Sequence, residues 1–218
     1  MAYIFPFFCL SCGSEGEILC QNCAEKQSKK IKKQGLITQD FRLQKQKSAL
    51  HLSKVKALFK YGQNAILSSL LRDFKYSYIR RIEEVWKRLI GEFGWDGDYD
   101  LIIPIPLHKR RLRERGFNQS EVLSKIFYNF LKSKNPNLVL NTENLKRVKY
   151  TRQQAKLNFA TRQENIKNCF VWMGGSLEGK KILLVDDVFT TGSTLEEAAK
   201  ALKAQGALNV EAFVLGKD

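Results

Sequence analysis

The chain has 218 residues, a length that suits one sizeable α/β core with a small appendage rather than two full domains. Its 44% hydrophobic and 27% charged residues are typical of a globular protein, and its longest apolar runs, such as Leu101 to Leu107, are too short to cross a membrane. The start, Met1 to Phe8, has no basic leader and is too short for a signal peptide, so we expect a cytoplasmic protein with no transmembrane segment.

The net charge of +15 is unevenly distributed along the chain. Residues 26–60 hold eleven Lys or Arg against one acid, Asp40, whereas residues 179–218 hold five basic residues against six acids. This places a positive field on the N-terminal side, which favours a phosphate-rich partner such as nucleic acid. A solvated basic linker explains the same charges equally well.

The first element is a pair of Cys-x-x-Cys motifs separated by seven residues, formed by Cys9, Cys12, Cys20 and Cys23. Gly13 and Gly16 allow tight turns between them. Four thiolates at this spacing predict a tetrahedral zinc site of the structural type, because the protein fills every coordination position. Disulfides are the weaker alternative in the cytoplasm. We assign residues 1–25 to this four-cysteine zinc-finger module.

A basic connector over residues 26–60 is expected to join the module to a main domain at 61–218. Residues 64–93 carry apolar side chains at spacings of three and four, which predicts two amphipathic helices with a break near Lys75 to Ser77.

Strands and helices are expected to alternate through the rest of the chain. Strands are predicted at 100–107, at one or two places within 137–149, and at 169–173, 181–185 and 209–215. Helices are predicted at 119–131 and 193–205. Such alternation indicates an α/β fold with a mainly parallel sheet flanked by helices on both faces.

A basic loop is predicted between the strand ending at Pro106 and the helix beginning at Gln119. It includes four cationic candidates for binding an anion, Lys109, Arg110, Arg111 and Arg115. Ligands of parallel sheets bind beyond the carboxyl ends of the strands, so this loop and the acidic segment described next can face one crevice. A solvated loop, or one that touches nucleic acid, is the alternative. The lone His108 is expected to be structural.

A buried strand at 182–185 runs into two acids and a hydroxyl-rich turn that opens a helix. The turn and its flanks comprise Asp186, Asp187, Val188, Phe189, Thr190, Thr191, Gly192, Ser193 and Thr194. Adjacent carboxylates can accept hydrogen bonds from a vicinal diol such as the ribose 2- and 3-hydroxyls. The hydroxyls, the glycine turn and the free amides of the helix start suit a 5-phosphate. An ordinary helix cap needs only one such group, so the sequence predicts a sugar-phosphate site.

This segment resembles the phosphoribosyl pyrophosphate (PRPP) binding motif of type I phosphoribosyltransferases, with Ser193 where many members have a second glycine. Further residues extend the likeness: the Pro-x-Pro strand end, the sequence Arg115-Gly116-Phe117-Asn118-Gln119, and Arg147, Thr151, Gln154, Arg162 and Asn165. Together they resemble the ComF family of competence proteins over nearly the whole chain, including its N-terminal zinc module.

The resemblance implies a type I phosphoribosyltransferase-like fold and a PRPP ligand that carries Mg²⁺ between its pyrophosphate and its ribose hydroxyls. Asp186 and Asp187 are then the residues at the reacting ribose, and the basic loop with Arg162 becomes the candidate for the pyrophosphate or for DNA. Residues 150–165 correspond to a flexible active-site loop. The implied macromolecular partners are single-stranded DNA and DNA-uptake proteins such as a competence helicase.

Three functions remain compatible with these residues. The first is a PRPP-binding protein of DNA uptake that also binds single-stranded DNA. The second is an active phosphoribosyltransferase acting on a small, nucleobase-like acceptor, and the third is a nucleic-acid-binding scaffold with a vestigial PRPP site. The intact acid pair and hydroxyl turn speak against the third, whereas enzymatic turnover stays open.

Overall fold

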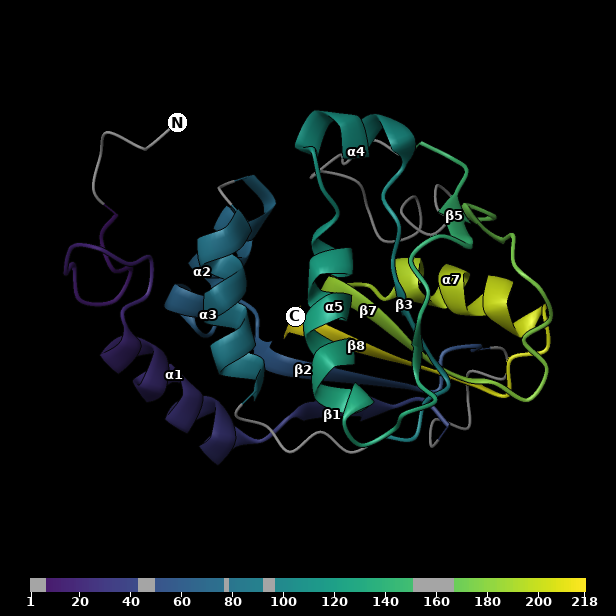
Figure 1. The fold of residues 1–218 in the computed structure, drawn as a ribbon, viewed down its shortest axis with the longest axis horizontal. Helices are drawn as coiled ribbons and strands as arrows, with labels where there is room; N and C mark the ends of the chain where they lie inside the picture. The colour runs from purple at the N-terminus through teal and green to yellow at the C-terminus, as the bar shows by residue number, and fades with distance from the viewer. Residues whose placement is uncertain (1–6, 43–49, 77–78, 92–96, 151–166) are drawn as a thin grey trace.

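The computed structural model describes residues 7–42, 50–76, 79–91, 97–150 and 167–218 (Figure 1). Its helices are α1 (Gln21–Gln34), α2 (Ala65–Tyr76), α3 (Ile79–Gly91), α4 (Lys109–Arg115), α5 (Gln119–Lys132) and α7 (Ser193–Lys203). Its strands are β1 (Ile37–Asp40), β2 (Lys54–Lys60), β3 (Leu101–Pro104), β4 (Val139–Leu140), β5 (Leu145–Arg147), β6 (Phe170–Trp172), β7 (Lys181–Phe189) and β8 (Asn209–Lys217). None of the described helices combines the length and the apolar character that a membrane span requires.

Six strands form the main sheet in the order β1-β2-β8-β7-β3-β4. All neighbours are parallel except β1, which pairs antiparallel with β2 at one edge. The remaining two strands, β5 and β6, form a separate antiparallel pair. The expected α/β architecture with a mainly parallel, helix-flanked sheet is therefore confirmed.

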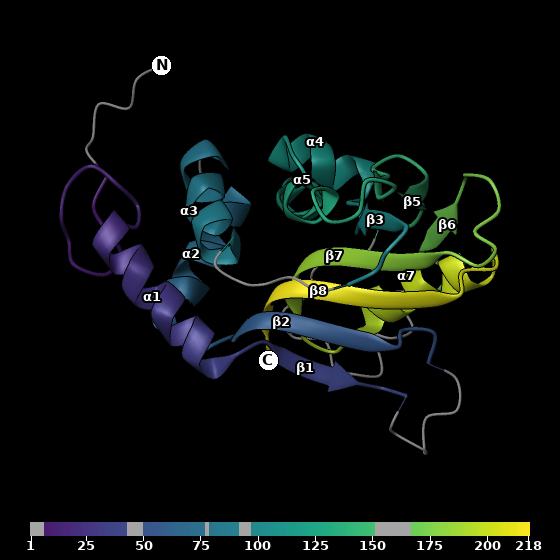
Figure 2. The same ribbon diagram turned by 60° about the horizontal axis from the view of Figure 1, so that its bottom comes forward.

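The central strand β7 is buried on both faces because its side chains alternate between two cores. Leu183 and Val185 join a cluster with residues of α1, α2, α3 and α5, whereas Ile182 and Leu184 join a second cluster with residues of α7. Figure 2 shows the helices distributed about the sheet, with α1 at the outer edge of the molecule. Period-two burial on both sides explains why this strand reads as an uninterrupted apolar run.

The predicted helical stretch at 64–93 forms α2 and α3, with residues 77–78 of the predicted break lying outside the described residues. The predicted strand at 100–107 is shorter, because β3 ends at Pro104. Proline has no N–H to donate to a sheet, which limits regular pairing at Pro104 and Pro106.

Two segments contain regular structure that the sequence did not predict. Residues 26–60, expected to be a connector, include most of α1 and the strands β1 and β2, and β2 pairs with β8 within the main sheet. The expected basic loop contains helix α4. His108 caps α4 by accepting the N–H of Arg110 at 3.3 Å, and Gly116 ends it in the left-handed conformation. Basic residues dominate both segments, so the apolar patterns typical of helices and strands are difficult to recognise in their sequences.

Candidate functional site

The acid pair lies at the carboxyl edge of the sheet, but within β7 rather than beyond it. The strand was predicted to end at Val185, and it continues to Phe189 because β8 remains paired with it. On the opposite side β3 ends at Pro104, which pairs with Val185. Asp186 and Asp187 therefore stand past the end of one neighbouring strand while the other strand holds their backbone in place.

Asp186 is held through one carboxylate oxygen. Its Oδ1 accepts the hydroxyl of Ser120 at 2.8 Å and the backbone N–H of Asp187 at 2.9 Å. Exclusion of water raises the pKa of Asp186 to about 7, and the neighbouring charge of Asp187 acts in the same direction. The site thus carries a carboxyl group whose charge responds to pH near neutrality.

Asp187 is held through its Oδ2 by two donors from different helices. Gln119 Nε2 on α5 donates to this oxygen at 3.1 Å, and Lys75 Nζ on α2 lies 3.1 Å from it. The Asp187 side chain is only 12% exposed, so both contacts are shielded from water. They fix the orientation of the carboxylate.

With respect to the described residues, this arrangement leaves one oxygen of each acid available. Among the residues that the structure describes, no donor contacts Oδ2 of Asp186 or Oδ1 of Asp187. Two fixed carboxylates with one open acceptor each are suited to two neighbouring hydroxyl groups. The protein donors already satisfy the other oxygens, so little reorganisation is needed to bind such a diol.

The turn after β7 is shaped by one glycine. Gly192 has φ 77°, and a Cβ there would lie 2.8 Å from two ring atoms of Phe189, so a side chain is excluded on both grounds. Thr191 Oγ1 and Ser193 Oγ lie 3.0 Å apart at the first turn of α7. Hydroxyls and unpaired amides at a helix start form the type of environment that binds phosphate.

The nine predicted segment residues do not all face outward. Phe189 is buried, with its ring centroid 6.3 Å from that of Phe41, and Val188 packs against the core that contains α5. The side chain of Phe189 is therefore withdrawn from a ligand and that of Val188 is partly buried, whereas Thr190 is exposed and Thr191 and Thr194 are partly exposed.

The sequence at 115–119 supports the acid pair rather than forming a separate site. Gly116 ends α4, and Asn118 caps α5 by accepting the N–H of Ser120 at 3.2 Å. The Asn118 amide also donates to the carbonyl of Ile105, just after β3, at 3.0 Å. This joins the start of α5 to the strand end and directs Gln119 and Ser120 toward the acids.

The basic candidates differ in their surroundings. Arg110 is bonded to Glu114 at 2.9 Å and lies over the ring of Tyr150, and Lys109 is exposed. Arg111 and Arg115 are partly buried. Arg162 lies outside the described residues, together with Thr151, Gln154 and Asn165 of the predicted active-site loop. Assignment of these cations to pyrophosphate or DNA stays a prediction.

Arg147 on β5 is a further cation near the acids. Burial lowers the pKa of its guanidinium. The positive charge of Arg111 acts in the same direction, and the negative charge of Asp186 opposes it. Its guanidinium also lies 5.5 Å from the ring centroid of Phe170 on the paired strand. No role was predicted for Arg147 from the sequence. Lys75 and Ser120 were not predicted as site residues, because they approach Asp186 and Asp187 only after the chain has folded.

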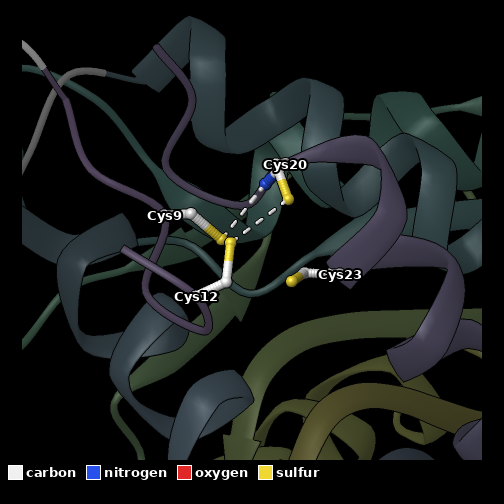
Figure 3. Close-up of side chains that lie close together, drawn as sticks. All are labelled: Cys9, Cys12, Cys20 and Cys23. Carbon is white, nitrogen blue, oxygen red and sulfur yellow. Dashed lines mark hydrogen bonds between the residues drawn. The ribbon is translucent and has the colours of Figure 1, made fainter. Parts of the chain in front are cut away.

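The four N-terminal cysteines converge, as Figure 3 shows, and their sulfur atoms all lie within 4.8 Å of one another. Cys12 Sγ and Cys20 Sγ are 3.7 Å apart. Tetrahedral zinc with Zn–S bonds of about 2.3 Å requires sulfur separations of about 3.8 Å. This cluster can hold a metal ion such as zinc.

The turns expected around the cysteines are present. Gly13 and Gly16 have φ angles of 72° and 114°, and their N–H groups donate to Cys9 O and Phe7 O, respectively. Cys20 precedes α1 and Cys23 lies in its first turn, so the helix continues directly from the cluster. The fifth cysteine, Cys169, is fully buried in the core that contains α7.

Comparison with known proteins agrees with this architecture. A family model described as "Phosphoribosyl transferase domain" matches residues 137–217. "Competence protein F" of Haemophilus influenzae is 30% identical over 98% of this chain and 85% of that protein. "Competence protein ComFC" of Bacillus subtilis is 31% identical over 71% of this chain and 61% of its own length. "DNA utilization protein YhgH" of Escherichia coli K12 is 35% identical over 53% of this chain and 48% of that protein. The chain belongs to the ComF family of competence proteins.

Proposed function

We propose that this protein binds PRPP with Mg²⁺ and takes part in natural transformation, where it also binds single-stranded DNA in the cytoplasm. The observation that carries the PRPP assignment is the pair of adjacent acids with one open oxygen each, followed by a turn of hydroxyls and amides. The acids suit the ribose diol and the turn suits the 5-phosphate. The names of its relatives support the role in competence.

The pyrophosphate would extend from the ribose toward the cations of α4 and β5. Arg111 and Arg147 are the best supported of these cations, because Arg147 interacts electrostatically with both Arg111 and Asp186. Mg²⁺ bound to PRPP would neutralise part of the pyrophosphate charge. If the ligand is turned over, the residues act by positioning the ribose and by stabilising the charge that develops as pyrophosphate departs.

The DNA contact is proposed on the outer face of α1. Its lysines at spacings of three and four, Lys26, Lys29, Lys30 and Lys33, are all exposed and span about 10 Å along the helix. The one acid of α1, Glu25, accepts a bond from Gln21, and no described acid pairs with the four lysines. Like charges one turn apart destabilise a helix, so their clustering favours a polyanionic partner.

A structural role is proposed for zinc at the cysteine cluster. Leu19, Cys23, Ala24 and Ile31 belong to the same core as α2, α3 and α5. The Arg81 guanidinium of α3 also lies 4.5 Å from the ring centroid of Phe7. Metal binding would therefore hold the beginning of α1 against the main domain, and with it the lysine face.

Transfer of the phosphoribosyl group to a small, nucleobase-like acceptor is the second candidate function. The complete acid pair and the glycine turn favour a working PRPP site over a vestigial one. These features are equally suited to the binding and to the turnover of PRPP, because both require the same contacts to the ribose and its phosphate.

One set of measurements tests these proposals. Calorimetry with MgPRPP is expected to detect binding to the wild type and none to Asp186→Ala/Asp187→Ala. Unchanged affinity in the double variant would remove the ligand assignment. A pyrophosphate-release assay with a panel of nucleobases and single-stranded DNA then separates an enzyme from a binding protein.

A further inference from the structure

The ion pair between Lys75 and Asp187 joins helix α2 to the acid pair. Lys75 lies in the last turn of α2, and its Nζ is 3.1 Å from Asp187 Oδ2, the oxygen that also accepts from Gln119. The side chains of the ion pair are 22% and 12% exposed. Partners that are withdrawn from water interact more strongly than surface pairs, and loss of one leaves the other charge poorly solvated.

The charges around this pair come from three elements. Asp186 and Asp187 are neighbours on β7, and Lys75 approaches them from α2. Arg147 on β5 interacts electrostatically with Asp186. Gln119 of α5 donates to Asp187 without contributing a charge. Lys75 is therefore the cation in direct contact with the acids among the described residues.

Two adjacent carboxylates with little water around them repel each other and tend to take up a proton. A protonated acid presents one donor where the ribose requires an acceptor. The ammonium of Lys75 opposes proton uptake, and its positive charge also reduces repulsion between the acids and an anionic sugar phosphate. Its contact with Oδ2 leaves Oδ1 of Asp187 in place for a hydroxyl.

We propose that Lys75 is a positioning residue of the phosphoribosyl site, which orients Asp187 and opposes protonation of Asp186 so that both acids can accept ribose hydroxyls. This inference rests on the proposed binding of PRPP. It assigns part of the site to α2, which precedes the residues 137–217 that match the phosphoribosyltransferase model.

The test compares Lys75→Met, which keeps most of the side-chain volume, with Lys75→Arg, which keeps the charge. Arg72→Met removes an exposed cation from the same helix and serves as the matched control. MgPRPP affinity is measured by calorimetry from about pH 5.5 to 8.5, on both sides of the pKa of Asp186 at about 7. Thermal unfolding of each variant checks that it is folded.

Lys75→Met is expected to bind MgPRPP about fivefold more weakly at pH 7, since a rise of one unit in a carboxyl pKa of about 7 lowers the charged fraction from about one half to about one tenth. The direction follows from the charge: without the lysine the carboxyl pKa rises, so binding is lost at a higher pH as the pH falls. Affinity should recover toward wild type at alkaline pH. Lys75→Arg should stay within about threefold of wild type, and Arg72→Met should match it.

A measurement on the ligand-free protein separates this inference from the proposed function. Carboxyl ¹³C NMR is expected to show Asp186 titrating at a higher pH in Lys75→Met than in wild type, because the charge of Lys75 lowers the pKa of Asp186. Identical Asp186 titrations would overturn the inference even if PRPP binds. An equal loss of affinity at every pH, shared by Lys75→Arg, would also overturn it, whereas failure of the wild type to bind MgPRPP would overturn the proposed function.

Discussion

The cysteine cluster takes all four sulfur atoms from residues 9–23, whereas the acid pair on β7 is supported by side chains from α2 and α5. Short turns bring the cysteines together, with glycines at the positions of positive φ. The acids are adjacent in sequence, but their donors Lys75, Gln119 and Ser120 reach them only through the packing of two helices on the sheet.

This difference determines what can disturb each region. A locally formed site depends on its own ligands and on a bound metal, and should be lost as a unit when the metal is removed. A site assembled by tertiary packing depends on several weaker contacts, each of which tunes charge or orientation. The two regions should therefore respond separately to metal removal and to substitutions near the acids.

Zinc removal should produce the largest effect. Metal analysis is expected to find one zinc per chain, because four cysteines form one site. Chelation should expose the lysines of α1 to trypsin, since the helix starts at the cluster. The affinity for MgPRPP should change by no more than about twofold, because the sites are separate. Protection of α1 in metal-free protein would contradict the structural role, and loss of MgPRPP binding would contradict the independence of the two regions.

Asp186→Asn should separate binding from stability. Asparagine can still accept from Ser120 and from the Asp187 N–H, but it carries no charge, so MgPRPP affinity should fall by about tenfold to a hundredfold. Asp98→Asn, which alters an exposed ion pair with Lys181, is the control and should leave affinity unchanged.

The same variant should become more stable at alkaline pH. Folding raises the pKa of Asp186 from 3.8 to about 7, so the folded state binds the proton more tightly than the unfolded state. The free energy of unfolding of the wild type should therefore decrease as pH rises between these values. Asp186→Asn removes this loss, and its Tm should exceed that of the wild type by at least about 3 °C at pH 8, with little difference at acidic pH. A lower Tm at pH 8 would contradict the assigned pKa.

Replacement of Lys26, Lys29, Lys30 and Lys33 by Gln should weaken single-stranded DNA binding without affecting MgPRPP. The slope of log affinity against log salt should become shallower by about 3, since each lost phosphate contact contributes about 0.7. Gln replacement of Lys109, Arg110, Arg111 and Arg115 provides the comparison. If this second set alters the slope and the first does not, DNA binds at α4 rather than α1.

Ser120→Ala should give the smallest change. It removes one donor to Asp186 Oδ1 and leaves the Asp187 N–H in place, so MgPRPP affinity should fall by about three- to tenfold. Ser124→Ala is the matched control, because that buried hydroxyl donates to the backbone carbonyl of Ser120 within the same helix. Equal effects of the two substitutions would indicate a general disturbance of α5.

Several features followed from the sequence because the interactions that produce them are local. The apolar run of β7, the order of acids and hydroxyls after it and the Cys-x-x-Cys pairs were all predicted, and the α/β architecture followed from alternating strands and helices. The helical periodicity of 64–93 likewise predicted α2 and α3. In each case the spacing along the chain is itself the physical signal.

Other features depended on which surfaces meet after folding. Strand β2 and helix α4 were concealed by their basic residues, and the extension of β7 to Phe189 required β8 as a partner. Lys75 gave no signal as part of the site, since it is one of many lysines until α2 packs near β7. The sequence by itself determined the chemical groups of the acid pair and the cysteine cluster, whereas only tertiary packing decided which distant donors set the charge and orientation of the acids.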